Sequence, residues 1–112
     1  MKIAIPVANG KLNAHFGHCE AFAVMDVDTA GKVITGRSDI AAPPHEPGLL
    51  PKWLGERGVG MIIAGGMGQR AQNLFRERSI DVLVGAPCDT PENLVNAWLG
   101  GRLVTGTNAC DH

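Results

Sequence analysis

Residues that can bind soft metals are few in this chain and are scattered along it. The 112 residues include four histidines and three cysteines, namely His15, His18, Cys19, His45, Cys88, Cys110 and His112. Thiolate and imidazole bind zinc, copper and iron–sulfur species, and thiolates favour sulfide-containing centres. The sequence has no Cys-x-x-Cys pair, so it does not support a preformed four-cysteine cage. Scattered ligands suit a site that holds a metal–sulfide cluster loosely and gives it up.

Three histidines are candidate metal ligands in the loops of the chain. His15 and His18 stand close together before a strand, and His45 lies among prolines. Each has a structural alternative, because a histidine before Phe16 can serve a turn and His45 can cap one. Both interpretations stay open for each histidine at this point.

Cys19, Cys110 and His112 complete the candidate ligand set. Cys19 follows His18 at the start of a strand. Cys110 and His112 lie on a polar tail that has little core to serve, which favours a function, with disorder as the alternative. Cys88 directly precedes a helix start, and there we predict a small buried packing residue, with metal ligation as the alternative.

A glycine-rich segment follows a short apolar strand and enters a helix. There, unpaired N–H groups and the helix dipole favour an anion. We therefore predict that this segment binds a cofactor, with Arg70 adding charge and Met67 forming a soft apolar lip; the residues assigned are Gly65, Gly66, Met67, Gly68 and Arg70. The spacing is neither the dinucleotide fingerprint nor a phosphate-binding loop. A tight turn without a ligand is the alternative.

Composition limits the classes of protein to which the chain can belong. A net charge of −1 and 4% aromatic residues provide no obvious surface for phosphates or stacked bases. The apolar runs are far shorter than the ~20 residues that cross a bilayer. The first residues show no basic region followed by an apolar segment, so we expect no signal peptide in them. We expect a soluble, cytoplasmic protein with one cluster-binding α/β domain over residues 1–106 and a flexible tail over 107–112.

The elements that must position these residues follow from hydrophobic periodicity. The pattern predicts helices that begin near Leu49, after Gly68 and at Pro91, the last with Thr90 as N-cap and Gly100 as terminator. It predicts strands over residues 2–7, 20–28, 33–40, 61–64 and 80–84. Alternation of helix and strand in the second half indicates a parallel sheet, joined to an antiparallel hairpin near the N-terminus.

Ligands of open parallel sheets bind beyond the carboxyl ends of the strands. If the first strand is parallel to the last two, the candidate loops 8–19, 41–48, 65–68 and 85–89 meet at one edge of the sheet. The eight residues from Thr105 onward, at up to about 3.3 Å each, can bring the tail back to the same edge. All the histidines and cysteines then share one end of the domain.

Taken together, these residues resemble a known family. The matching pieces are the opening Met-Lys-Ile-Ala-Ile-Pro-Val, the segment His15-Phe16-Gly17-His18-Cys19 with Phe22 after it, and residues 62–71 and 80–85. They resemble the dinitrogenase iron–molybdenum cofactor biosynthesis family, whose small carriers and accessory domains are similar to NifX, NafY and the C-terminal part of NifB. The tail and the loop around His45 look like a stand-alone branch found outside nitrogen fixation.

The resemblance implies both a fold and a cargo. It implies a three-layer, ribonuclease-H-like α/β fold whose mixed sheet has about five strands. It also implies noncovalent binding of a molybdenum- or iron-containing sulfide cluster, with His15 in contact with the cluster; molybdenum–copper sulfide carriers belong to the same likeness. Cluster-assembly ATPases or other cofactor-assembly proteins are the partners that it suggests.

We therefore predict a non-enzymatic protein that binds, stores or delivers a molybdenum/iron or molybdenum–copper sulfide cluster. One alternative is a metal-sensing or docking module for an ATPase partner. Another is a two-metal nuclease that uses the available carboxylates, Asp26, Asp28, Asp39 and Asp81. The nuclease is disfavoured because Asp26 and Asp28 lie at the turn end of their strand, away from the other loops.

Overall fold

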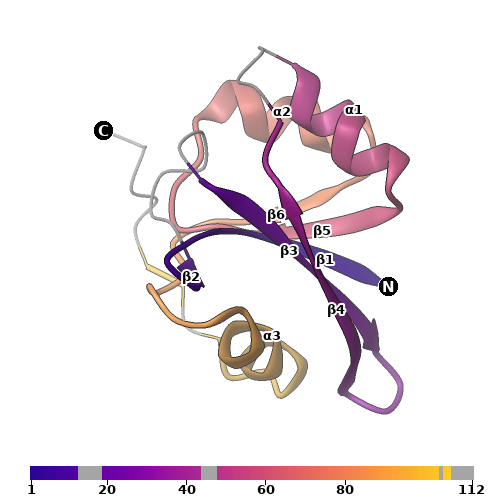
Figure 1. Ribbon diagram of the computed structural model, residues 1–112, viewed down its shortest axis with the longest axis vertical. Helices are drawn as coiled ribbons and strands as arrows, with labels where there is room; N and C mark the ends of the chain where they lie inside the picture. Colours follow the sequence, from indigo (N-terminus) through magenta and orange to yellow (C-terminus); the bar gives the residue numbers. More distant parts are fainter. Residues whose placement is uncertain (13–18, 44–47, 104, 107–112) are drawn as a thin grey trace.

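A mixed β-sheet forms the middle layer of the protein (Figure 1). The computed structural model describes residues 1–12, 19–43, 48–103 and 105–106. The strands lie in the order β4-β3-β1-β5-β6, and β2 pairs with β1 beside this path. Their bounds are β1 Lys2–Ala8, β2 Lys11–Leu12, β3 Ala21–Asp28, β4 Val33–Ala41, β5 Val59–Ile63 and β6 Asp81–Leu83.

Helices cover both faces of the sheet. They are α1 Leu49–Glu56, α2 Gln69–Glu77 and α3 Pro91–Leu99. Figure 1 shows α1 and α2 on one face and α3 on the other. The predicted α/β architecture with a mixed sheet is thereby confirmed, with six strands where about five were expected.

The central strand β1 contains Pro6, and the structure explains how a proline is tolerated there. Within a strand, a proline is typical of a sheet edge or of the end of regular pairing, and the sequence leaves both alternatives open for Pro6. Pro6 lies opposite Phe22 in the antiparallel β1–β3 ladder, whereas the parallel pairing of β1 with β5 covers only Lys2, Ile3 and Ala4. The missing N–H therefore lies beyond the end of the β5 ladder, and the edge alternative is wrong because β1 has a neighbour on each side.

The additional strand β2 arises from a two-residue turn that hydrophobic periodicity does not reveal. Val7 pairs with Leu12 and Ala8 with Lys11, so Asn9 and Gly10 connect β1 to β2. Both have left-handed backbone conformations, with φ of 55° and 80°. Asn-Gly is the favoured sequence for this hairpin turn, because each residue tolerates a positive φ.

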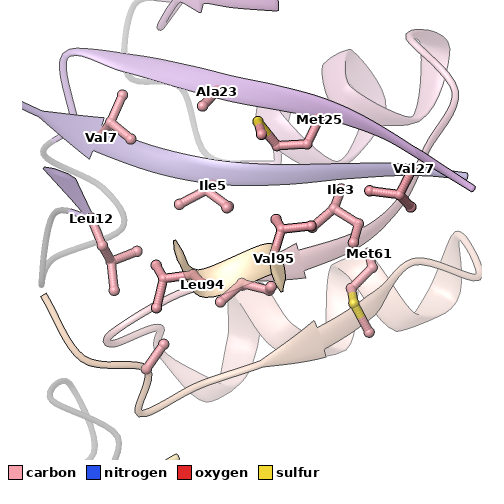
Figure 2. Packing of buried hydrophobic residues seen from close by; sticks show 12 residues of the cluster. Ile3, Ile5, Val7, Leu12, Ala23, Met25, Val27, Met61, Leu94 and Val95 are labelled. Carbon is pink, nitrogen blue, oxygen red and sulfur yellow. The ribbon is translucent and has the colours of Figure 1, made fainter. Parts of the chain in front are cut away.

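One apolar cluster fills the space between the sheet and α3. Figure 2 shows alternate residues of β1, among them Ile3 and Ile5, packed with Leu94 and Val95 of α3. Leu94 is 1% exposed and Val95 is 0% exposed. Burial of each such aliphatic side chain contributes roughly 1.5–3 kcal/mol, so this contact holds α3 on the sheet.

A second cluster fills the opposite face, under α1 and α2. Phe22 and Leu54 are fully buried there together with Phe75 of α2. Trp53 of α1 packs against Phe22, with ring centroids 5.8 Å apart, and the guanidinium of Arg57 lies 4.0 Å from the centroid of the Trp53 ring. Within the described parts of the chain, no helix is long and apolar enough to span a membrane.

Local sequence explains why the last helix begins and ends where it does. The Thr90 hydroxyl accepts a hydrogen bond from the amide of Asn93 at 3.3 Å, and Pro91 occupies the first turn. The helix ends at Leu99, directly before Gly100. These are the boundaries that the sequence predicted, since capping depends on neighbours within one turn.

Candidate functional site

Loops that are far apart in the sequence meet at one edge of the sheet. The strands β1, β4, β5 and β6 run in one direction and β3 runs in the other, as the pairings show. The carboxyl ends of four strands and the amino end of β3 therefore share an edge, which we call the rim. Its described residues are 9–12, 19–20, 42–43, 64–68, 84–89 and 105–106.

Backbone hydrogen bonds tie the rim segments to one another. The amide of Gly85 donates to the carbonyl of Gly65 at 3.0 Å, and the amide of Gly106 donates to the carbonyl of Gly85 at 2.7 Å. Gly85 has a φ of 81°, and a Cβ there would overlap the carbonyl group of Gly106. Only glycine permits this approach, and through it the chain returns to the rim at residue 106 before the tail begins.

The predicted glycine turn lies at the rim, and its residues differ in exposure. Gly65 and Gly66 are buried, whereas Gly68 is exposed and forms the N-cap of α2. Met67 is 1% exposed and packs in the cluster under α1 and α2. The exposed lip expected of Met67 is therefore wrong, because its side chain fills space between the turn and the core.

Gln72 supports this turn, a role that was not predicted from the sequence. It is 6% exposed, and its amide nitrogen donates to the Met67 carbonyl at 2.9 Å. Its side-chain oxygen accepts a hydrogen bond from Arg76 at 3.3 Å. The sequence offered one signal for this role: Gln72 lies three residues before Phe75, on the inward face of α2. A buried amide needs hydrogen-bond partners, so its position indicates a structural contact.

Among the described residues, no side chain caps the N-terminus of α2. The first helical hydrogen bond joins the Gln72 amide to the Gly68 carbonyl, so the amides of Gln69, Arg70 and Ala71 precede it. The first turn holds no acidic residue, and the side chain of Arg70 is exposed. This end of α2 therefore combines backbone donors, a positive dipole end and a nearby guanidinium.

The two described cysteines lie in contrasting environments. Cys19 is half-buried against the cluster under α1 and α2, and burial raises the pKa of its thiol to about 11. Cys88 is exposed, and its thiol donates to the Leu12 carbonyl at 3.3 Å. The predicted packing role of Cys88 is wrong, because Cys88 is exposed and belongs to neither apolar cluster.

Cys88 and Asp89 bind Leu12, the last described residue before the segment with His15 and His18. The amide of Leu12 donates to the Asp89 carbonyl at 3.0 Å. The Asp89 carboxylate accepts hydrogen bonds from the side chain of Asn93 and the amide of Thr90, which lower the pKa of that carboxyl. Leu12 is therefore attached to the loop after β6 through both Cys88 and Asp89.

The other predicted ligands fall outside the described residues: His15, His18, His45, Cys110 and His112. The described residues on either side of the segment with His15 and His18 lie at the rim, since Leu12 bonds to Asp89 and Glu20 bonds to Val7. In the described part of the chain, no group of three or more His, Cys, Asp or Glu residues is placed to hold a metal ion.

Three of the four carboxylates considered for a nuclease, all except Asp81, each bind a different partner. Asp26 forms an ion pair with Lys2 at 3.4 Å, and Asp39 pairs with Arg37 at 2.7 Å. Asp28 accepts hydrogen bonds from the amides of Ala30 and Gly31 in the turn after β3. None of these arrangements brings two carboxylates to one metal.

The geometry defines a class of protein: a three-layer α/β domain in which the described loops 64–68 and 84–89 meet at the carboxyl edge of the sheet. A family model described as "Dinitrogenase iron-molybdenum cofactor" matches residues 1–101. The chain belongs to this family, and the resemblance predicted from its motifs is confirmed.

Several known proteins share this sequence pattern or fold. An uncharacterized protein of Methanocaldococcus jannaschii is 31% identical over 110 residues, which cover 92% of this chain and 89% of that protein. The crystal structure of PH0822 has a TM-score of 0.89 at 24% identity over 100% of both chains. The apo form of the orange protein from Desulfovibrio gigas has a TM-score of 0.72 at 21% identity, covering 96% of this chain and 93% of its own. Both structures establish a common fold.

Proposed function

We propose that the rim binds a preassembled molybdenum- or iron-containing sulfide cluster, with copper as a further possible metal, and that the protein stores or delivers this cargo without catalysing a reaction. The observation that carries the proposal is the meeting of three features at the rim. These are the glycine turn before α2, the exposed thiol of Cys88 and the attachment points of the segment that contains His15 and His18. Membership of a family named for the iron–molybdenum cofactor supports the choice of cargo.

The glycine turn supplies the anion-binding part of the proposed site. Metal–sulfide clusters carry negative charge, and the N-terminus of α2 presents backbone donors and a positive dipole end. Gly68 is exposed, and no described atom lies within 4 Å of the position that a Cβ would take, so cargo can approach its backbone. Gly65, Gly66 and Met67 shape the turn from the inside, and Arg70 contributes charge at the surface.

Soft side chains supply the metal-binding part. Cys88 is the exposed described thiol, and Leu12 beside it leads directly to the segment with His15 and His18. His45, Cys110 and His112 are the further proposed ligands. Cys19 stays in the proposed set only as a weaker member, because its raised pKa favours the thiol over the metal-binding thiolate.

Anaerobic loading tests this function. Freshly purified protein is offered iron sulfide, thiomolybdate, or thiomolybdate with copper(I), and metal content and visible absorption are measured after gel filtration. We expect a coloured, metal-containing protein with at least one of these mixtures. A colourless, metal-free protein after all three contradicts the carrier function. Uptake of free metal ions without any sulfide species would instead favour the metal-sensing alternative.

A further inference from the structure

The outer strand β4 is a long edge of the sheet formed by the described residues. Among the described residues, β4 pairs only with β3, and none of its nine residues is buried. The opposite edge, β6, has only three residues. An edge of this length presents a row of backbone donors and acceptors, which is a template for adding another strand.

The direction of the backbone groups determines which residues of β4 can accept a new strand. The amide of Ala42 donates to the Glu20 carbonyl on the β3 side. Because hydrogen-bonding direction alternates along an antiparallel strand, even-numbered residues in this stretch face β3. Arg37, Asp39 and Ala41 therefore direct their backbone groups outward.

The regular part of β4 is limited by a bulge. The register with β3 is continuous from Ala41 to Gly36 and shifts between Gly36 and Ile34, which leaves Thr35 as the extra residue. A bulge bends the strand and interrupts pairing. Any added strand must therefore use the segment from Gly36 to Ala41.

The charges of Arg37 and Asp39 determine which register a second copy of β4 can adopt. A second copy of β4 in antiparallel orientation must match outward-facing residues with one another. Pairing Arg37 with Arg37, or Asp39 with Asp39, places like charges directly opposite, which is destabilising. The register centred on Ser38 instead places the Arg37 of each copy opposite Asp39 of the other copy, on the same face of the sheet. The dimer then contains two such pairs.

We propose that two copies of this chain associate through β4 in antiparallel orientation, centred on Ser38, to form one continuous sheet. The backbone of Arg37 and Asp39 provides the hydrogen bonds. Within one chain the Arg37 side chain pairs with Asp39 and Glu92. Across the seam, each Arg37 also faces Asp39 of the other copy, so the two pairs join into one network of alternating charge. The paired segment from Gly36 to Ile40 is short, so the dimer is small in interface area and depends on protein concentration. The inference does not depend on the proposed cargo.

Charge variants test the register directly in sedimentation equilibrium. Arg37→Glu places a carboxylate opposite Asp39, and Asp39→Arg places a guanidinium opposite Arg37. We expect each variant alone to weaken the dimer by about tenfold or more, and an equal mixture of the two to form a heterodimer. Glu92→Gln is the matched control, because it removes the contact of Arg37 with α3 and leaves both residues of the edge pair in place.

Hydrogen exchange of the unaltered protein provides a test that needs no variant. The outward amides of Arg37 and Asp39 should gain protection as concentration rises, whereas the amide of Ser38, which faces β3, should be protected throughout. Three results would overturn the proposal: a wild-type protein that is monomeric at every concentration, a variant mixture that stays monomeric, or protection of Arg37 and Asp39 that is independent of concentration. The last result would assign the edge to another segment of the same chain.

Discussion

At the scale of single residues, the surroundings of each sulfur atom decide what a cysteine can do. The thiol of Cys19 is half-buried beside apolar side chains, and its pKa of about 11 keeps it protonated near neutral pH. Cys88 is exposed, and its thiol contacts the Leu12 carbonyl. An accessible thiol at the rim is the better ligand for a soft metal.

Serine substitutions distinguish the packing role of Cys19 from the proposed metal-binding role of Cys88. We expect Cys88→Ser to reduce cluster retention several-fold with little change in Tm, because a hydroxyl is a poor ligand for soft metals and the site is exposed. Cys19→Ser should lower the free energy of unfolding by roughly 1 kcal/mol, because it buries a more polar group. Metal content after a chelator challenge and thermal melting measure the two effects. If Cys19→Ser lost the cluster and Cys88→Ser mainly lowered the stability, the two roles would be assigned to the wrong cysteines.

Gly85 is the residue through which Gly106 is attached to the rim. Gly85→Ala combines an unfavourable φ of 81° with a clash against the Gly106 oxygen. Gly10→Ala is the matched control, since its φ is 80° and no described atom lies within 4 Å of its Cβ position. We expect the control to lose about 1 kcal/mol of stability from backbone strain alone, and Gly85→Ala to lose more. Equal losses in urea unfolding would show that the Gly106 contact is unimportant.

At the scale of elements, a charge cluster joins β4 to α3. Arg37 donates two hydrogen bonds to Asp39, at 2.7 and 3.0 Å, and a third to Glu92 of α3. These hydrogen bonds from Arg37 hold the pKa values of both carboxyls below their ordinary range. The edge strand and the helix are therefore linked by groups that depend on pH.

Acid should loosen this link. Because the folded pKa values of Asp39 and Glu92 are lowered, their stabilising contribution is complete above the unfolded values of about 4 and is lost as pH falls through the folded values. Glu92→Gln should therefore show a smaller decrease in Tm between pH 7 and pH 3 than the wild type. Glu77→Gln on α2, outside the cluster, should match the wild type. An identical decrease in all three proteins would contradict the expectation.

At the scale of the whole molecule, β1 connects the two apolar layers. Ile3 and Ile5 face α3, and Ala4 faces the layer under α1 and α2; all three are 0% exposed. The same strand continues into the Asn9-Gly10 turn at the rim. Packing on both faces of β1 thus determines where the rim loops begin.

Truncation of β1 side chains should therefore affect global stability. Ile5→Ala should lower the free energy of unfolding by about 2–5 kcal/mol, because it removes fully buried methyl groups and leaves a cavity. Val33→Ala, at a position that is 49% exposed, should change it by less than about 0.5 kcal/mol. Denaturant unfolding monitored by circular dichroism compares the two, and similar losses would contradict the central role of β1.

Sequence alone was sufficient for features that depend on near neighbours. The start of α3 at Thr90-Pro91 and its end before Gly100 follow from contacts within a single helical turn. The strand predicted over residues 20–28 agrees within one residue with β3, Ala21–Asp28, because alternation is a local pattern. The family likeness rests on short motifs whose spacing is read directly from the chain. The Asn9-Gly10 hairpin was also available locally, although it was missed.

Tertiary structure alone decided which side chains are buried. Cys19 and Cys88 each adjoin a strand end in the sequence, yet one packs against the cluster under α1 and α2 and the other is exposed. The Met67 side chain is buried because it packs in the cluster under α1 and α2. Gly85 must be glycine because the carbonyl group of Gly106 occupies the place of a Cβ. In each case the deciding atoms come from a different turn or segment of the folded chain, so burial and close approach exist only once the layers have packed.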